Sequence, residues 1–192
     1  MAKNPKEGKL LYHITAFDNL DSIFENGLLP RNKINFNIKD VADDEILGNR
    51  KKFDLAKYTP FHFFSPTPFA GAAQMANKET DFVYITIKKG LALRNNFKII
   101  PSHPLSYNSE PLEWNKGIEE IDWDLMSLRD YSNHECKESC MAEAIFQGKI
   151  PAKFFFCLFV KNEEIKEKVV SLLEFYKLDI TVIINDFFFK RQ

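Results

Sequence analysis

Phe82-Val83-Tyr84-Ile85-Thr86-Ile87 is the stretch that decides the fold class. Nearly every residue in it is β-branched or aromatic, and the hydroxyl-bearing side chains alternate with apolar ones, which is typical of a β-strand. Similar short apolar runs predict further strands over 10–15, 61–64, 97–100, 141–146, 154–160 and 180–184. Because there are many short strands and few helices that could cross over a sheet, the sequence predicts an α+β fold.

The helices predicted around these strands are short. A helix over residues 18–27 begins at Asp18, which can cap its first turn, and ends at Gly27, which suits the position just beyond a helix. Further helices are predicted over 69–77, from 121–126 onward and over 163–176.

Three other segments receive different assignments. Residues 30–58 are polar and weakly periodic, so they predict a long loop or an irregular helical segment, and such loops are often functional. Residues 129–140 predict a second polar loop. The run Phe187-Phe188-Phe189 is short and wholly aromatic, which predicts a buried strand.

Length and composition favour one globular domain over residues 1–192. The net charge of −1 excludes a global basic field, although a local groove can still bind a short nucleic-acid strand. No apolar run reaches the roughly 20 residues of a membrane span, and residues 1–9 have no signal-peptide pattern. With only three cysteines, the chain is expected in a reducing cytoplasm, with no membrane partner.

Three polar residues stand in apolar or aromatic surroundings at well separated positions: His13, Arg50 and Glu143. His13 and Thr15 share one face of the first strand, where an imidazole and a hydroxyl can bind the hydroxyl groups of a ribose. The alternative is a histidine at the edge of the core that is satisfied by the backbone, and the residue taken alone favours that alternative.

Arg50 could place its guanidinium on a diphosphate, although a solvated charge within Arg50-Lys51-Lys52 is the simpler interpretation of that residue alone. Glu143 is a lone carboxylate within Met141–Phe146, and a carboxylate buried there requires a partner or a function. An edge-strand glutamate that faces solvent is the competing interpretation.

A zinc site built from His134, Cys136 and Cys140 is a weaker alternative, because no second pair of ligands follows at a metal-like spacing. We therefore predict no metal. The sequence also contains no phosphate-binding loop and no GxGxxG or HExxH motif.

Taken in order, these motifs resemble the DarT family of DNA ADP-ribosyltransferase toxins, which usually pair with a macrodomain antitoxin. Leu11–Thr15 resembles the opening of that family, Pro60–Phe69 its aromatic strand and turn, and Ala142-Glu143-Ala144 its catalytic glutamate motif. Arg50 falls within the family's arginine-rich segment. The resemblance covers nearly the whole chain and implies a split mixed or antiparallel sheet with flanking short helices.

The resemblance also implies a reaction, the transfer of ADP-ribose from NAD to a base in single-stranded DNA with release of nicotinamide. Glu143 would bind the nicotinamide ribose and stabilise its positive charge, and Arg50 would bind the diphosphate and help polarise the acceptor. The predicted NAD-binding residues are His13, Thr15, Asn19, Arg50, Phe63 and Phe69, with the two phenylalanines stacking on nicotinamide. The predicted acceptor-binding residues are Arg129, Tyr131, Asn133 and His134.

Two other functions stay open from the sequence. The acceptor could be RNA or a protein, because the NAD half of the site would be the same. The chain could also be a non-catalytic module with a relict nucleotide pocket, although the joint presence of His13, Arg50 and Glu143 speaks against it.

Overall fold

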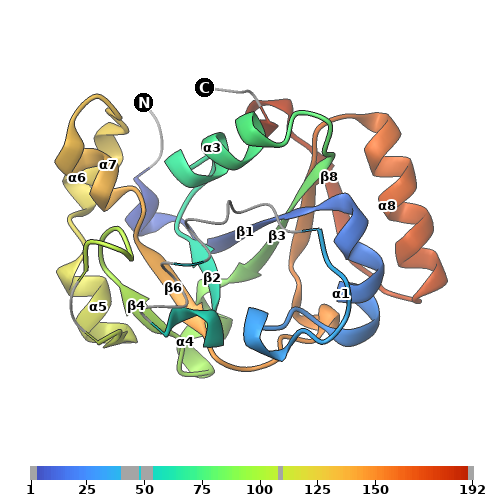
Figure 1. Ribbon diagram of the computed structural model, residues 1–192, viewed down its shortest axis with the longest axis horizontal. Coiled ribbons are helices and arrows are strands. Elements are labelled where there is room, and N and C mark those ends of the chain that lie inside the picture. Colours follow the sequence, from blue (N-terminus) through green and yellow to red (C-terminus); the bar gives the residue numbers. More distant parts are fainter. Residues whose placement is uncertain (1–3, 40–47, 49–53, 108–109, 190–192) are drawn as a thin grey trace.

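The structure, a computed structural model, describes residues 4–39, 48, 54–107 and 110–189. Its strands form one eight-stranded sheet in the order β5-β4-β6-β2-β1-β3-β7-β8 (Figure 1). The strands are β1 Leu10–Ala16, β2 Thr59–His62, β3 Phe82–Lys88, β4 Lys98–Ile100, β5 Leu112–Glu113, β6 Glu143–Phe146, β7 Cys157–Val160 and β8 Thr181–Ile184. The described pairings are antiparallel except for the parallel pair β7–β8, so the sheet is mixed and the predicted α+β class is confirmed.

Short helices surround the sheet. The α-helices with defined bounds are α1 Leu20–Asn26, α3 Pro68–Ala76, α4 Lys89–Arg94, α5 Trp114–Glu120, α6 Trp123–Leu128, α7 His134–Ser139 and α8 Glu163–Phe175. The 3-10 turns are η1 Pro5–Glu7, η2 Phe17–Asn19, η3 Arg31–Lys33, η4 Leu55–Lys57, η5 Ala152–Phe154 and η6 Asp186–Phe189. Figure 1 shows α8 beside β8 at one end of the sheet and α5, α6 and α7 grouped at the other. None of the described helices is long and apolar enough to cross a membrane.

The longest helix illustrates how the sequence specifies these elements. The side chain of Asn162 caps α8 by accepting a hydrogen bond from the Ile165 N–H at 3.0 Å. Ile165, Val169 and Leu173 are spaced four residues apart, and all three are buried against the core. A capped, amphipathic segment of this kind is therefore predictable from the sequence, and the predicted helix over 163–176 is confirmed.

Four predictions about local structure are wrong. The polar segment 129–140 contains α7, because the Asn133 side chain caps it and its two cysteines pack inward. The aromatic run 187–189 forms a 3-10 turn, η6, instead of a strand. Asp18 does not cap α1, because the intervening turn η2 places Asn19 at the cap position without a capping hydrogen bond. The strand predicted over 61–64 lies two residues earlier, since the chain leaves β2 after His62.

The feature of the sheet that matters for function lies between β1 and β2. These neighbouring strands share one register pair, Tyr12–His62, whereas β1 pairs with β3 along its whole length from Leu10 to Ala16. The two strands therefore diverge beyond Tyr12, and the sheet opens at this point, as expected for a split sheet.

Candidate active site

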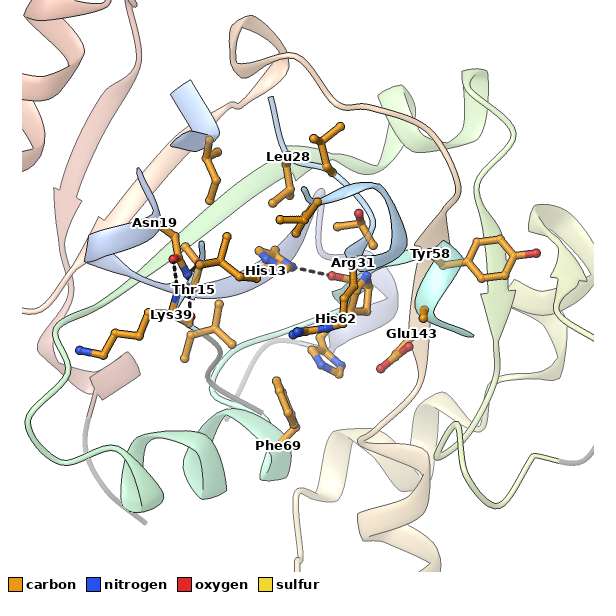
Figure 2. A pocket seen from close by; sticks show the side chains of 18 of the residues that line it. His13, Thr15, Asn19, Leu28, Arg31, Lys39, Tyr58, His62, Phe69 and Glu143 are labelled. Atoms are coloured by element: carbon orange, nitrogen blue, oxygen red, sulfur yellow. Dashed lines mark hydrogen bonds between the residues drawn. The ribbon is translucent and has the colours of Figure 1, made fainter. Parts of the chain in front are cut away.

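A cavity lies where β1 and β2 diverge. Its lining comes from β1, β2, the segment that follows α1, the start of β6 and several neighbouring turns. The lining residues include His13, Thr15, Asn19, Leu28, Arg31, Ile34, Phe36, Ile38, Lys39, Tyr58, Thr59, Pro60, His62, Phe69, His103, Met141 and Glu143. In Figure 2, His13 lies near the centre, between Glu143 at one end and Asn19 at the other. A mostly apolar hollow with a few converging polar groups is the usual form of a small-molecule site.

Glu143 is the first residue of β6, and 4% of its surface is exposed. Its register partners are His62 on β2 and Ile100 on β4, so three residues from three neighbouring strands form one row across the sheet. Directly opposed residues in an antiparallel pair point to the same face, which places the His62 imidazole beside the Glu143 carboxylate at the cavity wall. The interpretation of Glu143 as an edge-strand residue facing solvent is therefore wrong.

His13 lies within the fork between the two strands. Its Nδ1 lies 2.8 Å from the carbonyl oxygen of Pro60, and because a carbonyl only accepts, Nδ1 carries the proton (Figure 2). In the neutral ring Nε2 is then the acceptor. The hydrogen bond joins β1 to β2 beyond the point where their ladder ends, so His13 both lines the cavity and fixes its width.

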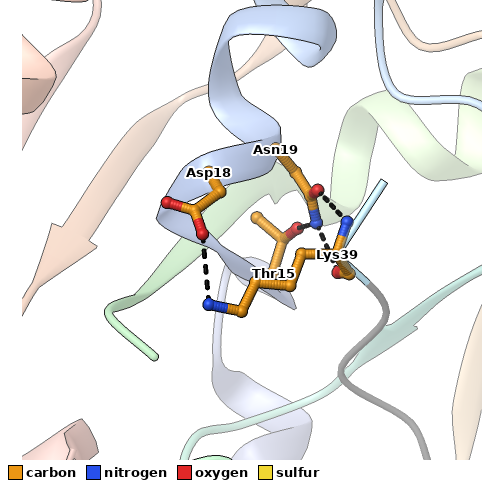
Figure 3. Close-up of polar contacts among 4 residues, drawn as sticks. All are labelled: Thr15, Asp18, Asn19 and Lys39. Atoms are coloured by element: carbon orange, nitrogen blue, oxygen red, sulfur yellow. Dashed lines mark hydrogen bonds and ion pairs between the residues drawn. The ribbon is translucent and has the colours of Figure 1, made fainter. Parts of the chain in front are cut away.

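Thr15 and Asn19 lie together at the other end of the cavity. The Asn19 amide donates to Thr15 Oγ1 at 3.1 Å and to the Lys39 carbonyl at 2.8 Å, and its Oδ1 accepts from the Lys39 N–H at 2.7 Å (Figure 3). Asn19 therefore binds both backbone polar groups of one residue, and both of its donor hydrogens are used. Asn19 thus has a structural role, which is to hold Lys39 in the covering segment, residues 29–39, several of which line the cavity; its predicted contact with the cofactor stays a prediction.

The two phenylalanines predicted to stack on nicotinamide lie in different places. Phe69, in the first turn of α3, lines the cavity with its ring centroid 5.9 Å from that of His62. Phe63 is 2% exposed and packs edge-on against Trp123, with ring centroids 5.2 Å apart. Its assignment to the cavity is wrong, because the side chain after His62 points to the opposite face and into the core.

The predicted acceptor residues 129–134 lie on the α6–α7 connection, and none of the four is among the described lining residues of the cavity. Arg129 ends α6 with a left-handed backbone and places its guanidinium 4.5 Å from the centre of the Phe64 ring. The Tyr131 hydroxyl donates to the Pro66 carbonyl at 3.3 Å. Both therefore rest on the segment that joins β2 to α3.

The other two predicted acceptor residues have different surroundings. The Asn133 side chain is used as the cap of α7, accepting from the Cys136 N–H at 3.0 Å. His134 is exposed and borders a shallow hollow with Glu120, Asp122 and Glu138, a setting unfavourable to a DNA phosphate. Asn133 and His134 are therefore less suited to bind the acceptor strand than Arg129 and Tyr131.

The zinc alternative does not fit the described part of the chain, which contains no group of three or more histidine, cysteine, aspartate or glutamate residues that could hold a metal. Cys136 and Cys140 are instead buried, with their thiols directed at the Leu125 and Met126 carbonyls of α6, at 3.1 and 3.5 Å. Burial raises the pKa of the Cys140 thiol to about 12. These cysteines hold α7 against α6.

Arg50 lies outside the described residues, so its assignment stays a prediction. Several cavity residues were not predicted from the sequence, among them Arg31, Tyr58, His62 and His103. His62 carries the same signal that marked Glu143, a polar side chain within an aromatic run. Three of the four histidines of the chain line this one cavity, and the His103 Nδ1 accepts from the Leu105 N–H at 3.1 Å, which leaves the proton of its neutral ring on Nε2.

The split sheet and the carboxylate at the wall of its cavity are features of an ADP-ribosyltransferase. The family described as "ssDNA thymidine ADP-ribosyltransferase, DarT" matches residues 12–189. The chain belongs to the DarT family. The predicted chemistry, NAD-dependent ADP-ribosyl transfer to single-stranded DNA, is confirmed at the level of the family.

Solved structures confirm the fold. "Thermus sp. 2.9 DarT in complex with ADP-ribosylated ssDNA" has a TM-score of 0.84 at 18% identity, covering 99% of this chain and 100% of that one. The same Thermus protein "in complex with NAD+" gives 0.77 at 16% identity, covering 96% and 98%. "Thermosipho africanus DarTG in complex with ADP-ribose" gives 0.75 at 22% identity, covering 94% of this chain and 51% of that one. A search of curated proteins found no match.

Proposed function

We propose that the cavity between β1 and β2 binds NAD⁺ and that Glu143 acts on the nicotinamide ribose during transfer of ADP-ribose to thymidine in single-stranded DNA. The observation that carries this proposal is the position of Glu143, a 4% exposed carboxylate at the wall of a largely apolar cavity. Taking a carboxylate out of water costs free energy, and a buried carboxylate at the wall of a cavity is therefore a candidate for a role in the chemistry of that site. The Thermus structures solved with NAD⁺ and with ADP-ribosylated DNA share this fold and support the proposal.

The reaction breaks the bond between the ribose C1 atom and the nicotinamide nitrogen and forms a bond from that C1 to an acceptor atom of thymidine. Nicotinamide leaves with the bonding electrons, and the acceptor releases one proton to solvent or to a cavity base. The Glu143 carboxylate accepts a hydrogen bond from a ribose hydroxyl and stabilises the positive charge that develops on the sugar. This side chain is fixed on a strand between two others, so little reorganisation accompanies the chemical step.

The remaining cavity residues supply binding and orientation. The Thr15 hydroxyl accepts from Asn19 and so has its own hydrogen to donate to a ribose or phosphate oxygen. His13 offers Nε2 to a ribose hydroxyl, and Phe69 offers its ring to the nicotinamide. Arg50 keeps its predicted role on the diphosphate and in polarising the acceptor. No step of this mechanism is routed through a metal.

The acceptor strand is proposed to bind across the α6–α7 connection, with Arg129 and Tyr131 as its main contacts. Burial raises the pKa of the Tyr131 phenol to about 12, so the hydroxyl stays neutral at physiological pH. An arginine above an aromatic ring and a neighbouring tyrosine are suited to phosphate contact and base stacking, respectively. Chemistry on a base also requires an unpaired or extruded nucleotide, which favours single strands.

Two further expectations accompany this function. The resemblance to the DarT family implies a macrodomain-type antitoxin as partner, so the enzyme would act as the toxin of such a pair. A cytoplasmic location is proposed because the target is DNA and all three cysteines are free and buried.

The experiment is to incubate the purified protein with NAD⁺ and single-stranded oligonucleotides that contain or lack thymidine, and to look by mass spectrometry for one added ADP-ribose. A thymidine-dependent adduct that disappears in Glu143→Ala is the expected result. Nicotinamide release only in the presence of RNA or protein would show that the acceptor is that molecule and not DNA. NAD⁺ binding without turnover on any acceptor would favour a non-catalytic module and contradict the proposal.

A further inference from the structure

The adjacent lysines Lys88 and Lys89 have opposite environments. Lys88 ends β3 and is exposed, with its ammonium group 4.5 Å from the centre of the Phe156 ring. Lys89 begins α4 and is half-buried. None of the described contacts of Lys89 joins it to a described residue of the proposed mechanism, so its burial requires a separate explanation.

The Lys89 ammonium lies between two backbone carbonyls and two aromatic faces. It donates to the Pro5 carbonyl at 2.8 Å and to the Lys6 carbonyl at 3.3 Å, both in the N-terminal turn η1. It also lies 5.3 Å from the ring centres of both Phe63 and Trp123. Lys89 thus joins the N-terminal turn, the segment after β2 and the first residue of α6.

Desolvation opposes the positive charge at this position, and the two carbonyls and two aromatic rings offset part of that cost. Burial lowers the pKa of Lys89 to about 8, and desolvation is the cause of that shift. An uncharged side chain of the same length would fill the space without this penalty. A charged group that is retained against a stability cost suggests that its interactions serve function and not only folding.

The residues that contact Lys89 are connected to Arg129 on the proposed acceptor surface. Phe63, beneath Lys89, is followed by Phe64, whose ring supports the Arg129 guanidinium at 4.5 Å. Trp123 begins the helix that ends immediately before Arg129, and its indole N–H donates to the Ile118 carbonyl at 2.8 Å. Arg129 has two supports, the Phe64 ring under its guanidinium and the helix α6 that carries its backbone. Lys89 contacts the residue that precedes Phe64 and the first residue of α6, so it holds both supports in place.

We propose that Lys89 is a positioning residue for the DNA substrate: by binding the η1 carbonyls and the faces of Phe63 and Trp123, it fixes α6 and thereby Arg129 against the segment after β2. This inference rests on the proposed function of the α6–α7 connection. The cavity residues Glu143 and His13 lie on β6 and β1, outside this chain of contacts. Lys89 consequently affects acceptor binding and not NAD⁺ binding.

The test compares Lys89→Met with wild-type protein in two assays. At saturating NAD⁺, the KM for a thymidine-containing single-stranded oligonucleotide is expected to rise about tenfold, the scale of one lost charge-assisted hydrogen bond. The KM for NAD⁺, measured by nicotinamide release without DNA, is expected to stay unchanged. The melting temperature is expected to stay the same or rise, because a desolvated charge has been removed.

Two further lysine variants serve as controls. Lys89→Arg retains the charge and the donors, so it is expected to recover most of the oligonucleotide affinity. Lys88→Met removes the neighbouring exposed charge and is expected to leave both KM values unchanged. If Lys89→Met does not fold, Asn4→Ala replaces it, because the Asn4 side chain accepts from the Lys6 N–H at 2.9 Å and shapes the turn that Lys89 binds. That variant should raise the oligonucleotide KM about threefold, in line with a lost capping bond.

The outcomes separate this inference from the proposed function. If the wild-type protein forms no DNA adduct, the proposed function and the inference both fail. If the wild type forms the adduct and Lys89→Met keeps its oligonucleotide KM, only the inference fails. Equal losses in DNA modification and NAD⁺ hydrolysis, accompanied by a lower melting temperature, would show a purely structural role and overturn it as well.

Discussion

The cavity between β1 and β2 and the surface formed by α6 and α7 hold their polar groups in different ways. In the cavity, whose lining is mostly apolar, His13 and Glu143 extend from paired strands. On the α6–α7 surface, Asp122 and Asn133 cap short helices, and Arg129 lies at a helix end with a left-handed backbone. Strands fix a catalytic group rigidly, whereas capped short helices place binding groups that depend on their neighbours. Substitutions should therefore act locally and strongly in the first region, and more weakly and indirectly in the second.

The largest effect is expected for Glu143→Gln. The amide keeps the size of the side chain and removes its charge, so ADP-ribosyl transfer should fall by about 10²- to 10³-fold, as when one preorganised electrostatic group is lost. Single-turnover release of nicotinamide measures this loss. A melting-temperature measurement on the same variant separates this catalytic loss from a loss of folding.

Glu167→Gln is the matched control, since Glu167 is exposed on α8 and far in sequence from the cavity strands. Transfer by the Glu143→Gln protein at nearly the wild-type rate would show that the carboxylate is structural, and the rigid cavity would then lose its catalytic interpretation.

A smaller effect is expected for Asn19→Ala. The substitution removes three hydrogen bonds that hold Thr15 and the Lys39 backbone. The free energy of unfolding should fall by about 1–3 kcal/mol. The KM for NAD⁺ should rise about tenfold, because the covering segment, residues 29–39, is held less firmly. Urea denaturation and nicotinamide release measure the two effects.

Asn26→Ala is the comparison variant, because the Asn26 side chain bonds only the adjacent Glu25 among its described contacts. A change in stability for Asn19→Ala with no change in the NAD⁺ KM would mean that the covering segment does not contact the substrate.

The same contrast explains what the sequence could predict. A strand has a side-chain period of two, so a single polar residue within an apolar run is conspicuous, and Glu143 and His13 were identified in this way. His62 carries an equal signal within Pro60–Phe63, yet the predicted site contains the neighbouring Phe63 instead. Most strands of the sheet are predictable for the same reason, with ends that differ by up to three residues, but the two-residue strand β5 is not predicted.

The α6–α7 region could not be predicted as well, because its helices are only six residues long and each begins at a polar cap, Asp122 or Asn133. Such a sequence has the composition of a loop, which is why residues 129–140 predict a loop and not α7. The roles of Asn19 and Lys89 were also hidden, since each depends on a backbone carbonyl far away in the sequence. No local pattern records a contact of that kind.

Arg129→Gly tests the weaker region with an effect of a few-fold. Arg129 has a φ of 52°, so glycine relieves backbone strain while removing the guanidinium, and stability should be unchanged or slightly higher. If the guanidinium contacts a phosphate, the oligonucleotide KM should rise, and the salt dependence of binding should lose about one unit of slope. Equilibrium binding of the oligonucleotide at several salt concentrations measures that slope.

Lys177→Gly is the matched control, because Lys177 has a φ of 54° and lies beyond α8, away from the α6–α7 surface. An unchanged salt slope in Arg129→Gly would remove the arginine from the DNA contacts and leave the acceptor surface to be found elsewhere.

The smallest effect concerns the pH dependence of stability. The pKa of Lys89 is about 8 in the folded protein and 10.5 as the ordinary lysine value, so between these pH values the unfolded chain binds a proton that the folded protein has released. Stability therefore rises with pH across this window, and the penalty is complete only below pH 8. The difference in unfolding free energy between wild type and Lys89→Met, measured in urea at several pH values, should narrow from pH 8 to pH 10.5. A difference that does not vary with pH would mean that the ammonium is not desolvated, and the argument that its charge is kept to position Arg129 would lose its energetic support.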